Sequence, residues 1–239
     1  GTMFDALFTT TTEYKKLSHA LSGKGACALF GLPASGRAQV YAALCRQLDK
    51  PLCIVTPGEA EATRFAADLN TLGIPAAVFP ARDYVLRPIE GTAREYEYRR
   101  LAVLGELVGG RLRAVAVPAE ALTQFPTPKE DFCANTRTLH AGDTLLRDDL
   151  LAALFGAGYT RRAQVDGPGQ FSVRGDIVDI FAPDQKMPVR MEFWGDEIDT
   201  LHTFDLTTQR REDAIDKFYL SPAREVLFGK PADAAEQLR

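Results

Sequence analysis

The hydrophobic pattern of this sequence changes its period near residue 126, and this change constrains the fold more than any other feature. Before it, short apolar runs alternate with helical patterns, whereas after residue 158 apolar and polar residues alternate one by one. The first pattern is typical of a parallel sheet whose strands are joined by helices, and the second of antiparallel hairpins. The sequence therefore predicts an α/β domain followed by a smaller α+β domain.

The N-terminal part predicts buried strands that alternate with helices, as in a parallel sheet. Ala26–Phe30 is a continuous apolar run, as expected of a strand buried on both faces. A capping box at Thr92 and Glu95 opens a helix that runs to Val108. We expect residues 1–125 to form a P-loop-like domain with a parallel sheet. Its other predicted strands are residues 52–55, 76–79 and 113–117, and its other predicted helices end near residues 48 and 72.

Residues 126–211 are predicted to form an inserted α+β domain with an antiparallel sheet, able to fold on its own. A helix is expected from about residue 143 to 155, and period-two strands follow it. Gly195 and Asp196 have the composition of a hairpin turn between two of these strands. Residues 212–239 are expected to start a return segment to the first domain.

A glycine-rich loop after the first predicted strand has the spacing of a phosphate-binding P-loop. Gly31 and Gly36 stand at its two glycine positions. Arg37, however, occupies the place of the lysine that reaches the β- and γ-phosphates, and Ala38 that of the hydroxyl that ligates Mg²⁺. We expect a degenerate nucleotide-binding loop, with no catalytic residues, no cofactor and at most a residual phosphate affinity at the helix N-terminus.

Other catalytic chemistry finds no support in the sequence. The segment from Val189 to Glu197 resembles a Walker B strand, but the polar residues that alternate along it favour a hairpin. No histidine accompanies a strained Gly-x-Ser-x-Gly turn, and the histidines lie too far apart for a histidine-rich metal site. The cysteines form no C-x-x-C pair, and those within apolar segments are expected to be small buried hydrophobes: Cys27, Cys45 and Cys53.

The charge balance gives no general basic field for nucleic acid, since the net charge is −4 and the isoelectric point is near 5.5. No apolar run approaches the roughly 20 residues of a membrane span, and no signal-peptide pattern opens the chain, so we expect a cytoplasmic protein. A weak DNA-binding module remains an alternative, although acidic residues dilute its basic patch. The arginines of that patch are Arg82, Arg87, Arg94, Arg99, Arg100, Arg111 and Arg113.

Motifs between residues 158 and 223 are specific enough to indicate a family. They resemble the inserted domain that the excision-repair protein UvrB shares with the bacterial transcription-repair coupling factors, and the likeness extends from about residue 12 to 228. The Thr-Gln-Arg ending and the Leu-Ser-Pro-Ala segment favour the coupling factors. The motifs are Gly158-Tyr-Thr-Arg161, Gly169–Phe181, Val189–Ile198, the segment from Thr203 to Arg210, and Leu220-Ser-Pro-Ala223.

The resemblance implies a docking function. In this family the inserted domain binds UvrA, the damage-sensing ATPase, and the contact residues correspond to Arg161, Arg174, Arg190 and Glu192. Ser172 replaces a further arginine of UvrB. Full-length members also bind RNA polymerase and translocate on double-stranded DNA, so this chain resembles an N-terminal piece. Only a short segment joins Phe79 to Thr92, where UvrB has its DNA-clamping hairpin, and damage clamping is not expected.

Overall fold

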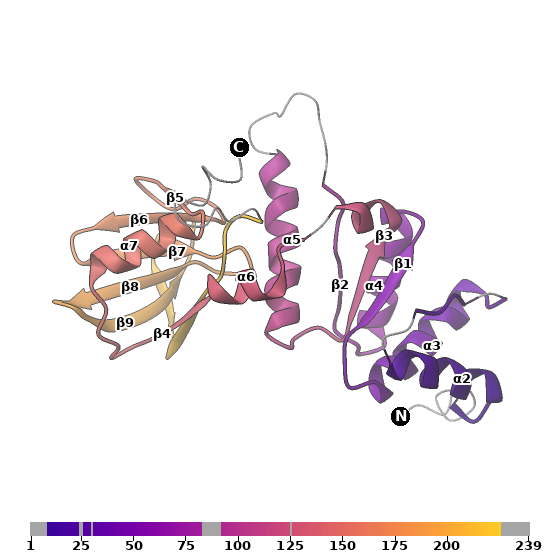
Figure 1. The fold of residues 1–239 in the computed structure, drawn as a ribbon. Helices are drawn as coiled ribbons and strands as arrows, with labels where there is room; N and C mark the ends of the chain where they lie inside the picture. The colour runs from indigo at the N-terminus through magenta and orange to yellow at the C-terminus, as the bar shows by residue number, and fades with distance from the viewer. Residues whose placement is uncertain (1–8, 24–25, 30, 83–91, 125, 226–239) are drawn as a thin grey trace, which may run out of the picture. The chain divides into compact units, whose positions relative to one another are not determined.

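The computed structural model describes residues 9–23, 26–29, 31–82, 92–124 and 126–225. The chain divides by its contacts into two compact units (Figure 1). Unit 1 comprises residues 1–82 and 109–125, and unit 2 comprises residues 83–108 and 126–239. No helix of the described part is long and apolar enough to cross a membrane.

Unit 1 is built around a three-stranded parallel sheet with the strand order β1-β3-β2, which confirms the predicted parallel sheet. Its core joins the helices to the sheet through residues such as Leu44, Leu69 and Ile54. The N-terminal helix α2 was not predicted. The elements are α2 (Thr12–Ser22), α3 (Ala34–Gln47), β1 (Leu52–Thr56), α4 (Glu59–Thr71), β2 (Ala76–Val78), β3 (Ala114–Pro118) and the 3-10 helix η1 (Ala119–Thr123).

The strand predicted at residues 26–30 is wrong for its described part. Residues 26–29 have no regular secondary structure, and Ala26, Cys27 and Ala28 are exposed; Phe30 lies outside the described residues. An apolar run becomes a buried strand only where a neighbouring strand accepts its backbone hydrogen bonds. Strand β1 is an edge of the described sheet, and no described strand pairs with its open side.

The cysteines depart from their predicted burial in the same region. Cys45 is buried as expected, but Cys27 and Cys53 are exposed. Cys53 lies on β1, where buried and exposed residues alternate, because the helices cover only the side of this edge strand that carries Leu52 and Ile54. Burial raises the pKa of the Cys45 thiol to about 11.

Unit 2 is built around a six-stranded sheet with the order β10-β9-β8-β7-β6-β5. Neighbouring strands are antiparallel except β5, which runs parallel to β6. The predicted antiparallel hairpins are thus confirmed, and Gly195 forms the β8–β9 turn with a φ of 62°. The strands are β5 (Thr160–Arg161), β6 (Gln170–Arg174), β7 (Ile177–Phe181), β8 (Val189–Trp194), β9 (Glu197–Phe204) and β10 (Arg211–Ala214).

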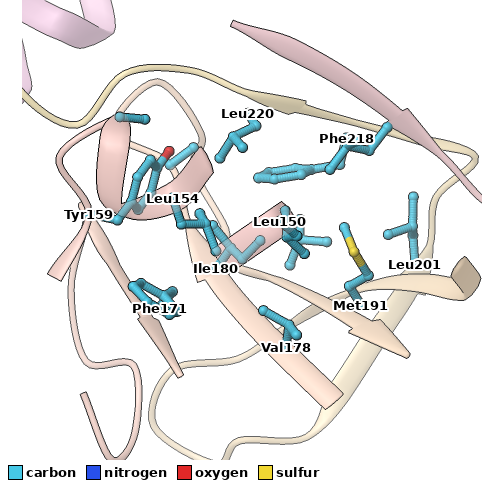
Figure 2. Close-up of a cluster of buried hydrophobic side chains, with 14 of the residues drawn as sticks. Leu150, Leu154, Tyr159, Phe171, Val178, Ile180, Met191, Leu201, Phe218 and Leu220 are labelled. Carbon is cyan, nitrogen blue, oxygen red and sulfur yellow. The ribbon is translucent and has the colours of Figure 1, made fainter. Parts of the chain in front are cut away.

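The main core of unit 2 lies between this sheet and helix α7 (Arg147–Gly156). Figure 2 shows Leu150 and Leu154 of α7 among the sheet residues Ile180 and Met191. Phe218 belongs to the same core, although it follows the predicted boundary at residue 211. It lies on β11 (Lys217–Leu220), which pairs antiparallel with β4 (Arg137–His140); the short helix α6 (Lys129–Ala134) precedes β4.

Helix α5 (Thr92–Val108) lies between β2 and β3 in sequence, yet its contacts place it in unit 2. The fully buried Arg100 donates from Nε to Glu225 Oε1 at 2.8 Å, which ties the helix to the C-terminal end of the described chain. Gly105 leaves space for Asp184, because a Cβ at this glycine would come within 2.7 Å of its carboxylate. The helix is therefore closely fitted to unit 2.

The sheet face opposite α7, here called the outer face, contains a buried ion pair. Asp179 of β7 is 1% exposed and accepts hydrogen bonds from Arg190 Nε at 2.7 Å and from Nη2 at 2.9 Å. The Arg190 guanidinium also lies 4.7 Å from the Phe204 ring centroid and donates to the Gln209 carbonyl. Because Asp179 and Arg190 are directly opposite in the β7–β8 register, the ion pair links the two central strands of the sheet.

We expect Phe218→Ala to lower the free energy of unfolding by about 3–5 kcal/mol, because it removes a ring that is 1% exposed from the core of unit 2. Tyr219→Ala, on the exposed side of the same strand, should cost far less. Urea unfolding followed by circular dichroism measures both. Equal losses for the two variants would show that β11 does not belong to the cooperative core.

We expect Arg190→Ala to lower the free energy of unfolding by about 3–5 kcal/mol, because it leaves the Asp179 carboxylate buried without its principal partner. Arg174→Ala should cost less than about 1 kcal/mol, since that side chain is half exposed and its oxygen partner is 3.5 Å away. Thermal and urea unfolding of both variants test the difference. A stable Arg190→Ala variant would contradict the structural role of the pair.

Candidate functional site

The outer face carries three of the four residues that the resemblance assigned to UvrA docking. Arg174 of β6 and Glu192 of β8 lie in one cross-strand row with Ile177 of β7 between them. Trp194 follows two residues after Glu192 on β8, and side chains two apart on a strand share a face. The sequence prediction that Arg190, Glu192 and Trp194 share one face is consistent with this alternation.

Arg174 presents its guanidinium to solvent. Its side chain is 53% exposed, and Nη2 lies 3.5 Å from Asp179 Oδ2. The same oxygen accepts the closer bond from Arg190, so Arg174 is held only weakly. A guanidinium in this setting can form a bidentate pair with a carboxylate of another molecule.

Glu192 is engaged within the face rather than free. Its Oε1 forms an ion pair with Arg211 Nη2, and Oε2 lies 3.5 Å from Thr200 Oγ1. The Glu192 side chain is partly covered, whereas that of Arg211 is about half exposed. Arg174, Glu192 and Arg211 therefore give the outer face alternating charges, and Arg211 is a candidate that the sequence analysis missed.

Arg190 lies beneath this surface. Asp179, Phe204 and Gln209 occupy its guanidinium, and the hydrogen bonds to Asp179 raise its pKa further. Its side chain is only 10% exposed, so it supports the face rather than presenting a charge to a partner. Asp179 was missed as well; its only sequence signal is an acid in the middle of an apolar strand.

Arg161 is exposed but lies apart from the other predicted site residues. It belongs to the edge strand β5 and pairs with Phe171, whose side chain lies in the core on the face of α7. Residues paired across a sheet project to the same side, so Arg161 belongs to the α7 side of the sheet and not to the outer face. A partner would contact both Arg161 and Arg174 only if it reached around the β5 edge of the sheet.

In the glycine-rich loop of unit 1, the arginine that replaces the P-loop lysine is bonded to the loop itself. Gly31 has a φ of 81°, and helix α3 begins at Ala34, so Gly36, Arg37 and Ala38 lie inside the helix. Arg37 Nε donates to the Leu32 carbonyl at 2.9 Å, and Ala38 is buried. The predicted residues are thus adjacent, but none offers a ligand for Mg²⁺.

A groove of about 780 Å³ runs beside this loop. Its lining is mainly apolar and comes from α2, α3, β1, α4 and the segments between them, residues 26–29 included. Its two cations, Arg37 and Lys50, donate to main-chain carbonyls of Leu32 and Ser22. Within the described ranges no cluster of His, Cys, Asp and Glu could hold a metal ion.

The alternative basic patch loses two of its arginines. Arg100 is fully buried against Glu225, and Arg113 donates to the carbonyls of Cys45 and Leu48. Arg94 lies 3.3 Å from Thr160 Oγ1 and Arg99 lies over the Tyr96 ring. Arg87 lies outside the described residues. These contacts weaken the case for a DNA-binding surface formed by this set.

Comparison with known proteins agrees with the geometry of unit 2. Residues 138–226 match the family model of the UvrB interaction domain. The transcription-repair-coupling factor of Bacillus subtilis (strain 168) is 28% identical over 212 residues, which cover 88% of this chain and 18% of that protein. That of Myxococcus xanthus is 35% identical over 209 residues, covering 83% and 17%. That of Mycobacterium tuberculosis (strain CDC 1551 / Oshkosh) is 38% identical over 192 residues, covering 77% and 15%.

The chain thus spans less than a fifth of the length of these curated relatives. The family match begins within β4 and ends after the described part of the chain, so it includes the whole six-stranded sheet with its outer face. Residues 138–226 thus match the UvrB interaction domain, in a chain that is similar over most of its length to the transcription-repair-coupling factors.

Proposed function

We propose that this chain is a non-catalytic docking module that recruits the excision-repair protein UvrA to stalled RNA polymerase. The observation that carries the proposal is the outer face of the UvrB interaction domain, where Arg174 is exposed and only weakly held. In the family that the sequence resembles, the equivalent domain binds UvrA. RNA polymerase and double-stranded DNA are the further partners that the resemblance implies for full-length members of the family.

The docking surface we propose comprises the outer face and the adjoining β5 edge. Arg174 and Glu192 lie on the face, and Arg161 lies on the edge. Arginine suits such a surface because its planar fork pairs with carboxylates in two parallel hydrogen bonds. Arg190 belongs to the same set by resemblance, and its contribution is to hold Asp179 and the sheet beneath the surface.

Charge reversal at the surface tests this proposal. We expect Arg174→Glu to weaken UvrA binding roughly a hundredfold or more, because truncating a desolvated charge pair costs about 2–5 kcal/mol and each 1.4 kcal/mol is tenfold. Arg161→Glu should also weaken binding if the partner reaches the β5 edge. Both side chains are exposed, so neither change should lower the melting temperature much. Calorimetric titration of the 239-residue chain with UvrA measures the affinities.

The matched control is Arg46→Glu on helix α3, an exposed arginine of unit 1 that donates to the Leu72 carbonyl. It carries the same charge change and should bind UvrA like the parent. If the parent binds UvrA, and the Arg161→Glu and Arg174→Glu variants bind it as tightly as the parent, the docking surface lies elsewhere. DNA binding that falls steeply with salt, without any UvrA binding, would instead favour the DNA-binding alternative.

We expect no measurable binding or hydrolysis of ATP by this chain. Arg37 is bonded to the loop itself and Ala38 has no oxygen for Mg²⁺. The double variant Arg37→Lys, Ala38→Thr should not create an ATPase, because the sequence of the first domain has no acidic pair at the end of a predicted strand to assist the metal. Titration with ATP and Mg²⁺, together with a phosphate-release assay, checks both. Micromolar binding with turnover would contradict the non-catalytic reading.

A further inference from the structure

Trp194 is the most exposed large apolar side chain of the described residues, at 82% of its full exposure. It is the last residue of β8, just before the Gly195 turn, and it is the only tryptophan in the chain. The preceding residue, Phe193, lies on the core face of the strand and is buried. The Trp194 ring therefore does not pack in the core of unit 2.

The hairpin tip that carries Trp194 is held in place by the backbone of the segment before α7. Gly142 N donates to Ile198 O at 2.7 Å, and Ile198 N donates to Asp143 O at 2.9 Å. Leu145 N donates to Asp196 O at 2.7 Å, on the turn itself. An aromatic side chain on a fixed backbone loses little conformational entropy on binding, because only its two side-chain torsions are left to order.

Charged residues of the proposed docking surface lie on the same sheet face as this ring. Glu192 precedes Trp194 by two residues on β8, and Arg174 shares the row of Glu192. Like Trp194, Arg174 directly precedes a turn glycine, Gly175, and the β6–β7 turn that follows is bonded to β8 through Phe193 N and Asp176 O. Both side chains thus stand at the same end of the sheet, on two turns that are joined to each other.

We propose that Trp194 is the apolar anchor of the UvrA-docking surface, and that it inserts into a pocket of UvrA beside a carboxylate that pairs with Arg174. This inference rests on the proposed function and adds a residue that the family resemblance did not supply. Tryptophan and arginine are enriched among the residues that dominate binding energy at protein interfaces. A second copy of this chain is the competing occupant, because an exposed ring on a rigid tip can also support self-association.

The single tryptophan allows a direct test. The chain is labelled with 5-fluorotryptophan, so that one ¹⁹F resonance reports on position 194 while unlabelled UvrA stays silent. On adding UvrA, we expect the resonance to shift and its solvent isotope shift between H₂O and D₂O to shrink as the ring leaves water. We expect Trp194→Ala to weaken UvrA binding at least about thirtyfold, the smallest effect of an interface hot spot.

The controls separate the possible outcomes. Tyr219→Ala, a partly exposed aromatic on β11, should leave the affinity unchanged, and Trp194→Ala should keep the parental melting temperature because the ring is exposed. Trp194→Phe should recover part of the lost affinity. If the parent binds UvrA while the ¹⁹F signal and the Trp194→Ala affinity stay unchanged, the anchor is overturned and the proposed function stands.

Two further results are informative. If the parent chain does not bind UvrA at all, the proposed function fails and the anchor fails with it. If the ¹⁹F resonance moves with the concentration of the chain alone, and Trp194→Ala abolishes that shift, the ring contacts a second copy and UvrA is overturned as its occupant.

Discussion

The buried carboxylate of Asp179 constrains the six-stranded sheet of unit 2, because it needs a charged partner on the neighbouring strand. A buried charge in the middle of a sheet lowers stability unless it is paired and hydrogen-bonded. Arg190 on the neighbouring strand meets this need, because its Nε and Nη2 donate to the two carboxylate oxygens at 2.7 and 2.9 Å. A slip of one residue between β7 and β8 would turn every side chain to the other face and separate the pair. The ion pair therefore helps to define the register that places Arg174 and Glu192 in one row.

The hydrophobic period predicted both main sheets because each sheet has a buried face, and the spacing of apolar residues along a strand reveals that face. The hairpin at Gly195 and the parallel order of β1 and β3 follow directly from that pattern. The strand predicted at residues 26–30 failed because pairing depends on a neighbour that a local pattern does not reveal. Likewise, the sequence position of α5 could not show that Arg100 meets Glu225, a residue 125 positions further along the chain.

The sequence predicted which residues of the candidate site share a sheet face, but not how far each side chain is buried. Alternation along β8 places Arg190, Glu192 and Trp194 on one face, and the structure agrees. Their burial differs because it depends on other segments: Asp179, Phe204 and Gln209 enclose Arg190, while the hairpin tip leaves Trp194 in solvent. Arg211 was missed since its contact with Glu192 requires knowing that β10 pairs with β9.

The two exposed arginines of the outer face differ in what binding would cost them. Arg211 would have to loosen a direct ion pair with Glu192 before it could turn to another carboxylate. Arg174 faces an oxygen of Asp179 that Arg190 already satisfies, so its rotation leaves no buried group unpaired. A carboxylate of the proposed partner would therefore compete with only a weak contact at Arg174, whereas at Arg211 it would compete with the ion pair to Glu192. The pairing of Asp179 with Arg190 therefore leaves the Arg174 guanidinium available to the partner we propose.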